Sequence, residues 1–143
     1  MSTPESIQVA VLSGSPSDAE MVDACCEVLR DYGIAHERRV LSAHRQPQAL
    51  QAFMEKAEER GCRLYIALAG MAAHLPGVVA SQTSRPVLGV PLKGGFLDGL
   101  DALLAVVQMP GGVPVGTLAV GKAGAKNAAH LAARVLALSL IHI

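Results

Sequence analysis

The chain has 143 residues, the size of one domain, and a chain of this length buries about two thirds of the surface that its unfolded form exposes. Lys and Arg total 12, as do Asp and Glu, so the broad positive field with which nucleic-acid-binding proteins collect phosphates is absent. No apolar run approaches the roughly 20 residues of a membrane-spanning helix, and residues 1–8 lack the apolar segment of a signal peptide. We therefore expect a cytoplasmic protein with no nucleic-acid or membrane partner.

Apolar residues make up 51% of the chain, but most are Ala, Val and Leu, and there are only two Phe, two Tyr and no Trp. So many apolar side chains in so short a chain suggest that other subunits cover part of the surface, so we expect a homo-oligomer. Cys25, Cys26 and Cys62 lack the spacing of metal ligands, and we expect them to be buried, reduced thiols. We therefore predict no metal site.

The first strand and helix are predicted between Ile7 and Gly33. Ile7–Leu12 is a short aliphatic run, typical of a buried strand, and Ser13–Asp18 forms the turn into a helix. Gly33 is placed to end that helix, and Ser17 with Glu20 three residues later fits a capping box at its start. The apolar positions predicted for its buried face are Met21, Cys25, Val28, Leu29 and Tyr32.

The rest of the chain continues to alternate short aliphatic runs with stretches of helical spacing, which is the pattern of βα units. The other predicted strands are Ala35–Leu41, Leu64–Ala69, Val87–Val90 and Val115–Val120, and the other predicted helices run from Pro47 to Gly61, near Val78–Ser81, over Asp101–Val107 and over Ala125–Leu140. This order predicts an α/β fold of three layers, in which a doubly wound parallel sheet has helices on both faces.

Three unusual segments follow the first three predicted strands. They are Ser13–Asp18 (SGSPSD), Ser42–Gln46 (SAHRQ) and Gly70–Gly77 (GMAAHLPG). Ligands of open α/β sheets bind outside the carboxyl ends of the strands, so these segments should meet around one site.

The first two segments contain groups that suit a phosphate and a proton transfer. SGSPSD offers a glycine, hydroxyls and N–H groups at a helix start, which favour an anion, although simple helix capping would also explain them. Gly14 is not followed by the further glycines of a dinucleotide fingerprint, so NAD is disfavoured. In SAHRQ, Arg45 could hold a phosphate with two hydrogen bonds, and His44 could then act on the base of a nucleotide.

The third segment surrounds a single histidine, His74, with small residues, so that the backbone can approach a flat ring closely. His74 either contacts the substrate or holds the loop, and both roles stay open. His36, His130 and His142 stand in strand, helix and tail contexts without such neighbours, so a structural role is predicted for them.

Together with Val107–Ala129 (VQMPGGVPVGTLAVGKAGAKNAA), these segments resemble the N5-carboxyaminoimidazole ribonucleotide mutases of purine biosynthesis. The motifs GSPSD, SAHR, AAHLPG and VQMP occur in the same order and spacing, and the match covers nearly the whole chain. The resemblance implies a flavodoxin-like homo-octamer that uses neither a metal nor an organic cofactor and borrows site residues from neighbouring subunits. Its substrate would be a small phosphorylated imidazole nucleotide, which it would convert to 4-carboxy-5-aminoimidazole ribonucleotide in the synthesis of IMP.

The resemblance also implies a role for each matched residue. His44 falls on the catalytic histidine of the family, which serves as both acid and base. Matched positions would hold the phosphate (Ser15, Ser17 and Arg45), bind the ribose hydroxyls (Asp18), and line the imidazole pocket (Ser42, Ala43 and the run Gly70, Met71, Ala72, Ala73, His74 and Leu75).

Several positions depart from the family pattern: Met71, Leu68, Ala19, Gln46 and Ala105. Met71 stands in place of a glycine, and we expect it to narrow the imidazole pocket. Relatives commonly continue into another helix after the position of Ile143. We expect residues 1–143 to form a single nucleotide-binding catalytic domain, and the sequence leaves open that it lacks this helix.

Three other functions share some of these sequence features. The related aminoimidazole ribonucleotide carboxylase uses free carbon dioxide. Its motif resembles SAHK at the position where Ser42–Arg45 have the sequence SAHR, and it has a more polar loop in place of AAHLPG. A relative that acts on a pyridine nucleotide in nickel-cofactor synthesis shares fewer motifs. A non-catalytic flavodoxin-like module is disfavoured for two reasons. Flavin binding normally uses aromatic rings, and the chain has only two Phe and two Tyr. A phospho-acceptor receiver domain needs an Asp where Ala69 and Gly70 stand.

Overall fold

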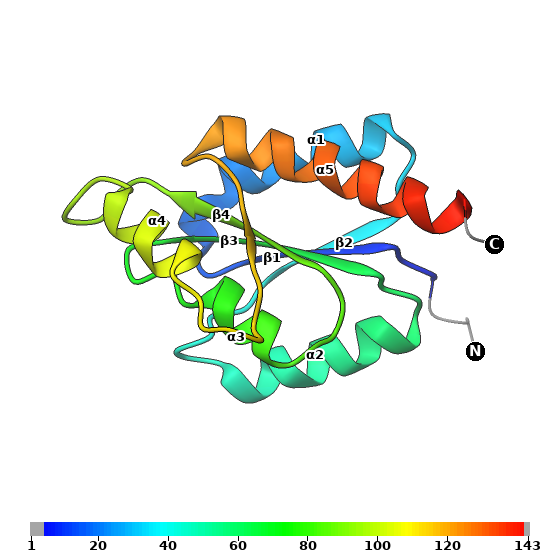
Figure 1. The fold of residues 1–143 in the computed structure, drawn as a ribbon, viewed down its shortest axis with the longest axis horizontal. Coiled ribbons are helices and arrows are strands. Elements are labelled where there is room, and N and C mark those ends of the chain that lie inside the picture. The colour runs from blue at the N-terminus through cyan, green and yellow to red at the C-terminus, as the bar shows by residue number, and fades with distance from the viewer. Residues whose placement is uncertain (1–4, 142–143) are drawn as a thin grey trace.

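The computed structural model describes residues 5–141, with side chains described as far as residue 138. The end of the chain at 142–143, including His142, therefore lies outside the described residues. Within 5–141 the strands form one parallel sheet in the order β2-β1-β3-β4-β5, between two layers of helices (Figure 1). This is the strand order of flavodoxin-like folds, and it confirms the predicted three-layer α/β architecture.

The elements alternate along the chain as predicted. The strands are β1 (Val9–Ser13), β2 (His36–Val40), β3 (Leu64–Gly70), β4 (Val87–Leu92) and β5 (Gly116–Thr117). The helices are the short 3-10 helix η1 (Pro16–Asp18) followed by α1 (Ala19–Asp31), α2 (Pro47–Glu59), α3 (Leu75–Ser81), α4 (Leu100–Val107) and α5 (Lys122–Ile141). No helix among residues 5–141 is long and apolar enough to span a membrane.

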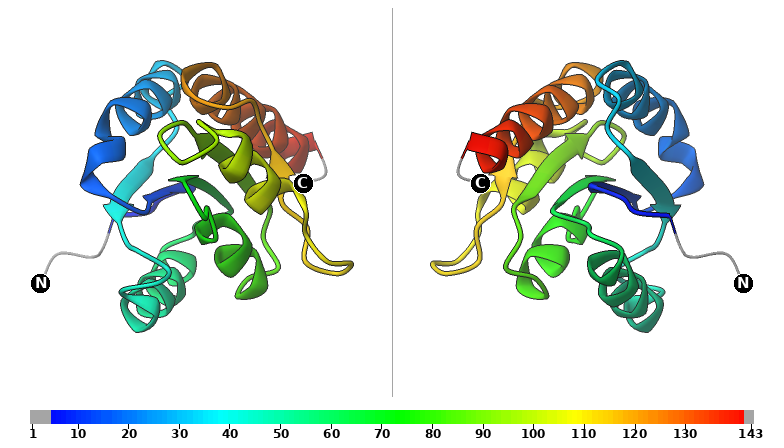
Figure 2. Two further views of the ribbon diagram at one scale, coloured as in Figure 1. Left: turned by 90° about the vertical axis from the view of Figure 1, so that its left-hand side faces the viewer. Right: turned by 90° about the vertical axis from the view of Figure 1, so that its right-hand side faces the viewer.

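Two hydrophobic cores lie on the two faces of the sheet. Because successive side chains of a strand point to opposite faces, Val9 and Val11 belong to one core, with α1 and α5, while Ala10 and Leu12 belong to the other, with α2, α3 and α4. Figure 2 shows α1 and α5 on one side of the sheet and α2 and α3 on the other. All three cysteines are buried and unpaired, as predicted, and act as small apolar residues.

The glycines predicted to end α1 and α2 do so. Gly33 has a φ of 71° and its N–H donates to the carbonyl of Arg30, while the N–H of Ile34 donates to Leu29. This pair of bonds is a Schellman motif, which requires a left-handed residue and therefore favours glycine. Gly61, with a φ of 98°, ends α2 in the same way.

Two local predictions are wrong, and a third is only partly right. Ser17 does not cap α1: the chain first passes through η1, whose cap is Ser15, and Asp18 precedes α1 without a capping side chain. The predicted buried face of α1 is partly right: Cys25 and Leu29 are buried, and Met21 and Val28 pack partly buried against the core. Val22, Ala24 and Cys26 are also buried, whereas Tyr32 is 51% exposed. The fifth strand pairs over only two residues, since Leu118 and Gly121 bond to β4 outside the regular ladder.

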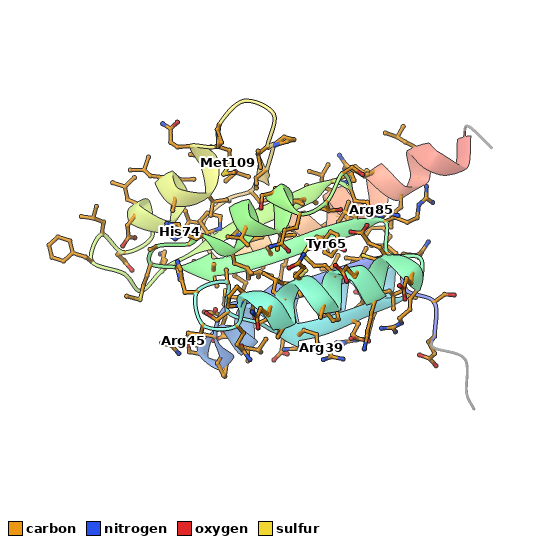
Figure 3. All side chains as sticks on the ribbon, turned by 90° about the horizontal axis from the view of Figure 1, so that it is seen from below. Arg39, Arg45, Tyr65, His74, Arg85 and Met109 are labelled. Atoms are coloured by element: carbon orange, nitrogen blue, oxygen red, sulfur yellow. The ribbon has the colours of Figure 1, made fainter. Side chains whose placement is uncertain are left out.

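The amino-terminal end of the sheet is fixed by hydrogen bonds to Glu58 of α2. Its carboxylate accepts bonds from the Tyr65 hydroxyl (2.7 Å), Thr83 Oγ1 (2.9 Å) and Arg85 Nη1 (2.7 Å). Arg85 Nε also donates to the carbonyl of Cys62 at 2.8 Å. Figure 3 shows Tyr65 and Arg85 away from Arg45 and His74, toward the other end of the sheet. The network therefore ties α2 to the starts of β3 and β4.

Candidate active site

A cavity of about 480 Å³ lies at the carboxyl ends of β1, β2 and β3. It includes the point between β1 and β3 where the strand order reverses, which is where open α/β sheets bind their ligands. All the residues predicted for the site line this cavity: Ser15, Ser17, Asp18, Ser42, Ala43, His44, Arg45, Gly70, Met71, Ala73, His74 and Leu75. The three segments therefore meet as predicted.

The segment after β1 presents two hydroxyls and a carboxylate to the cavity. Ser15 Oγ accepts a bond from the N–H of Ser17 at 3.2 Å and lies 2.9 Å from Ser17 Oγ. Pro16 opens η1, and the N–H of Asp18 donates to the carbonyl of Ser15. Burial raises the pKa of Asp18, and a hydrogen bond with the Ser15 backbone partly opposes that rise. Asp18 is thus held where its charge is poorly solvated.

The segment after β2 forms a tight turn closed by its first and last residues. Ser42 Oγ accepts a bond from the N–H of Arg45 at 3.1 Å, and Gln46 Oε1 accepts one from the N–H of Ser42 at 3.2 Å. The N–H of Gln46 also donates to the Ser42 carbonyl at 2.8 Å, just before α2 begins at Pro47. The turn leaves His44 and Arg45 exposed, and Arg45 makes no ion pair with any described residue.

The two histidines of the site contact each other. Nε2 of His44 lies 2.6 Å from Nδ1 of His74, and the ring planes are inclined by 73°. His74 directly precedes α3, between the buried residues Ala73 and Leu75. The sequence singled out both histidines but could not show the bond, because it joins residues 30 positions apart.

Met71 has a backbone conformation that glycine favours. Its φ is 55°, in the left-handed region that costs a residue with a Cβ about 1–2 kcal/mol, and its side chain is 65% exposed at the edge of the cavity. The glycine expected here from the family pattern would adopt this conformation without that cost.

Lys93 directly follows β4 and also lines the cavity, although it was not predicted for the site. The same rule that identified the first three segments would have found it, since β4 is parallel to β3 and ends at the same edge of the sheet. The smaller lining residues Ala69 and Gly94 were also not predicted for the site. Among the described residues, no three His, Cys, Asp or Glu side chains gather as a metal site would require.

The family of the chain follows from comparison with known proteins. A model of the family described as AIR carboxylase matches residues 8–143. The chain belongs to this family. Within the AIR carboxylase family, it is 54% identical over 129 residues to a protein of Saccharolobus solfataricus named N5-carboxyaminoimidazole ribonucleotide mutase, a match that covers 90% of this chain and 80% of the relative.

Two further comparisons agree. The chain is 52% identical over 130 residues to the Escherichia coli K12 protein of the same name, which covers 91% of this chain and 77% of the relative. Its fold is similar to the crystal structure of Treponema denticola PurE, with a TM-score of 0.83 and 28% identity over 92% of this chain and 80% of that one. The family resemblance and the flavodoxin-like fold expected from the sequence are therefore confirmed.

Proposed function

We propose that this member of the AIR carboxylase family is an N5-carboxyaminoimidazole ribonucleotide mutase of purine biosynthesis. The observation that carries the proposal is the cavity itself, in a chain about half identical to proteins of that name. In it a turn with two serine hydroxyls and a histidine meet an arginine that has no ion pair among the described residues. The reaction moves a carboxyl group from the exocyclic nitrogen of the imidazole ring to C4.

The charges around the cavity suggest how the nucleotide lies in it. Its phosphate would sit against Ser15, Ser17 and Arg45, where two hydroxyls and a guanidinium that lacks an ion pair among the described residues can donate hydrogen bonds. Asp18 would accept bonds from the ribose hydroxyls. The imidazole ring would then lie against Ser42, Ala43 and the small residues from Gly70 to Leu75, close to His44.

The chemistry needs one group that gives and then takes a proton. The substrate is a carbamate; when its N–C bond breaks, carbon dioxide leaves and the departing nitrogen gains the proton that His44 supplies. C4 of the electron-rich ring then attacks the carbon dioxide, and His44 removes the C4 proton, so that the ring regains its aromaticity. An imidazole can serve in both directions near neutral pH. The apolar wall around Leu75 would slow the escape of carbon dioxide between the two steps.

A further part of the proposal is that eight copies of this single nucleotide-binding catalytic domain assemble in the cytoplasm, and the exposed apolar surface supports the association of subunits. Large exposed apolar side chains gather on the loop before α4 and on α4 itself: Phe96, Leu97, Leu100, Leu104 and Val107. Phe96 is 98% exposed, which is costly in water unless another subunit covers it. Light scattering should give a mass near eight chains of 14.8 kDa each, and an active monomer would contradict the assembly.

The decisive experiment follows the carboxyl carbon. Carbamate substrate labelled with ¹³C at its carboxyl group is incubated with the protein in excess unlabelled bicarbonate, and the product is analysed by mass spectrometry. A mutase should place most of the label in the product, whereas a direct carboxylase, the activity that the family description names, would give the isotope ratio of the pool. A reaction without protein corrects for unassisted breakdown of the carbamate.

The matched variant for this experiment is His44→Asn. It should keep the fold, measured by circular dichroism, and the binding of product, while turnover falls by about 10²- to 10⁴-fold, the usual contribution of a positioned acid–base group. Normal turnover in this variant would remove His44 from the mechanism.

A further inference from the structure

The contact between His44 and His74 constrains how the two rings carry protons. Their centroids are 4.8 Å apart and their planes are inclined by 73°, so the rings meet edge to face and a nitrogen of each points at the other. A separation of 2.6 Å between Nε2 of His44 and Nδ1 of His74 requires one N–H between them. One ring must donate and the other accept, so both rings cannot be imidazolium ions while this bond exists.

Both residues are held by their backbones. The N–H of His74 donates to the carbonyl of Ala72 at 2.6 Å, and the His74 carbonyl accepts a bond from Val78 in the first turn of α3. His44 lies within the turn that Ser42 and Gln46 close. The bond between the rings therefore joins two anchored segments, the end of β2 and the start of α3.

The remaining charged groups of the cavity do not provide an alternative partner for His44. Asp18, Arg45 and Lys93 line the same cavity, yet none of them forms a hydrogen bond or ion pair with either histidine ring in the described part of the chain. In the described part of the chain, the His74 side chain is the one that makes a hydrogen bond to the His44 ring and so fixes its rotation. With Nε2 engaged, Nδ1 is the nitrogen of His44 that remains for a ligand.

We propose that His74 is a positioning residue for His44. Through the bond between the rings, it holds the His44 ring in one orientation and one tautomer, so that a defined nitrogen, Nδ1, exchanges the proton with the substrate. The proposal rests on the proposed mutase function for its catalytic consequence, but the pairing itself is a property of the protein without substrate. In this role His74 acts on turnover through His44 rather than by binding the nucleotide.

Two substitutions separate positioning from a merely structural role. His74→Phe keeps a ring of similar shape but removes the hydrogen-bonding nitrogen. His74→Asn keeps a polar atom near the position of Nδ1 and should restore the bond. His130→Phe is the control, because His130 also bonds to an aromatic residue, Tyr32 at 2.8 Å, but lines no part of the catalytic cavity.

The readouts are ¹⁵N NMR of histidine-labelled protein without ligand and steady-state kinetics with the carbamate substrate. His74→Phe should change the ¹⁵N shifts of His44 to those of a tautomer mixture. It should also lower kcat by about 10- to 100-fold with little change in KM, since part of the about 10²- to 10⁴-fold contribution of an acid–base group depends on its orientation. His74→Asn should restore most of kcat and the single tautomer, and His130→Phe should leave both readouts of the site unchanged.

Either of two results overturns the proposal. Unchanged ¹⁵N shifts of His44 in His74→Phe would mean that the pairing does not set the tautomer. A raised KM with normal kcat would make His74 a substrate contact instead. If the unaltered protein shows no mutase turnover, the proposed function fails, and the ¹⁵N shifts of His44 still decide whether His74 holds the ring.

Discussion

Removing the carboxylate of Glu58 should destabilise the fold without touching the cavity. Glu58 is the shared acceptor for Tyr65, Thr83 and Arg85, and its side chain is only 24% exposed. Glu58→Ala removes all three bonds, while alanine remains the best helix former for α2. Burial, and then the bond to Glu58, raise the pKa of Tyr65, so that the buried hydroxyl remains a donor that needs an acceptor.

The magnitude follows from the burial of each donor. Tyr65 is fully buried and keeps only a long 3.3 Å contact with the Met54 carbonyl, so its loss costs about 1.5–2 kcal/mol. Thr83 is partly buried and adds about 1 kcal/mol. Arg85 is 39% exposed, so water replaces much of its ion pair and the loss is about 0.5–1 kcal/mol. The free energy of unfolding should therefore fall by about 3–4 kcal/mol.

The assay is thermal and urea unfolding at one fixed protein concentration, because oligomer formation would make stability depend on concentration. The control is Glu59→Ala on the same helix, since Glu59 is exposed and its change should have little effect. Tyr65→Phe, alone and combined with Glu58→Ala, completes a double-mutant cycle, and a coupling of about 1–2 kcal/mol is expected for groups in direct contact. Equal stability of the Glu58 and Glu59 variants, or additive effects in the cycle, would refute the reasoning.

Three further predictions concern the cavity. Arg45→Lys should raise KM by about tenfold, the equivalent of about 1.4 kcal/mol, and leave kcat nearly unchanged. Lysine keeps the positive charge but cannot make the bidentate hydrogen bonds of arginine to a phosphate. Steady-state kinetics in which kcat falls more than KM rises would contradict this. Because burial raises the pKa of Asp18, the folded state binds this proton more tightly than the unfolded chain, so its contribution to stability falls as the pH rises from acid to neutral. Asp18→Asn should therefore melt higher than the unaltered protein at neutral pH and lose that advantage in acid, and a difference that grows in acid would reverse the sign. Met71→Gly should keep or raise the melting temperature, because glycine adopts the φ of 55° without strain. The control, Ala72→Gly, should lower the melting temperature. Equal decreases in melting temperature in both variants would argue against strain at Met71.

Features that depend on a few neighbouring residues could be predicted from the sequence. Gly33 and Gly61 end their helices because only the local backbone decides whether a left-handed residue is needed there. Pro47 begins α2 for a similarly local reason. The position of the site could also be predicted, because the carboxyl ends of parallel strands must lie at one edge of the sheet.

Features that depend on long-range geometry could not be predicted. The bond between His44 and His74 depends on the relative height of β2 and α3, which no local pattern contains. The Glu58 network likewise joins residues 7 to 27 positions apart. The cap of α1 was predicted wrongly for a local reason: Pro16 favours a helical turn that begins before Ser17, so η1 precedes α1.

The polar groups at the two ends of the sheet differ in whether they have hydrogen-bond and ion-pair partners. The difference fits a structural role for the amino-terminal end and a role in ligand binding for the carboxyl end. At the amino-terminal end, Glu58 and Arg85 are paired and hydrogen-bonded to buried partners. At the carboxyl end, Arg45 has no ion pair among the described residues, Asp18 is poorly solvated and Met71 has a strained φ. A bound anionic nucleotide would supply the missing partners at the carboxyl end only. Binding of the nucleotide should therefore stabilise the carboxyl end more than the amino-terminal end, because the ligand supplies hydrogen-bond and ion-pair partners that the free protein lacks there.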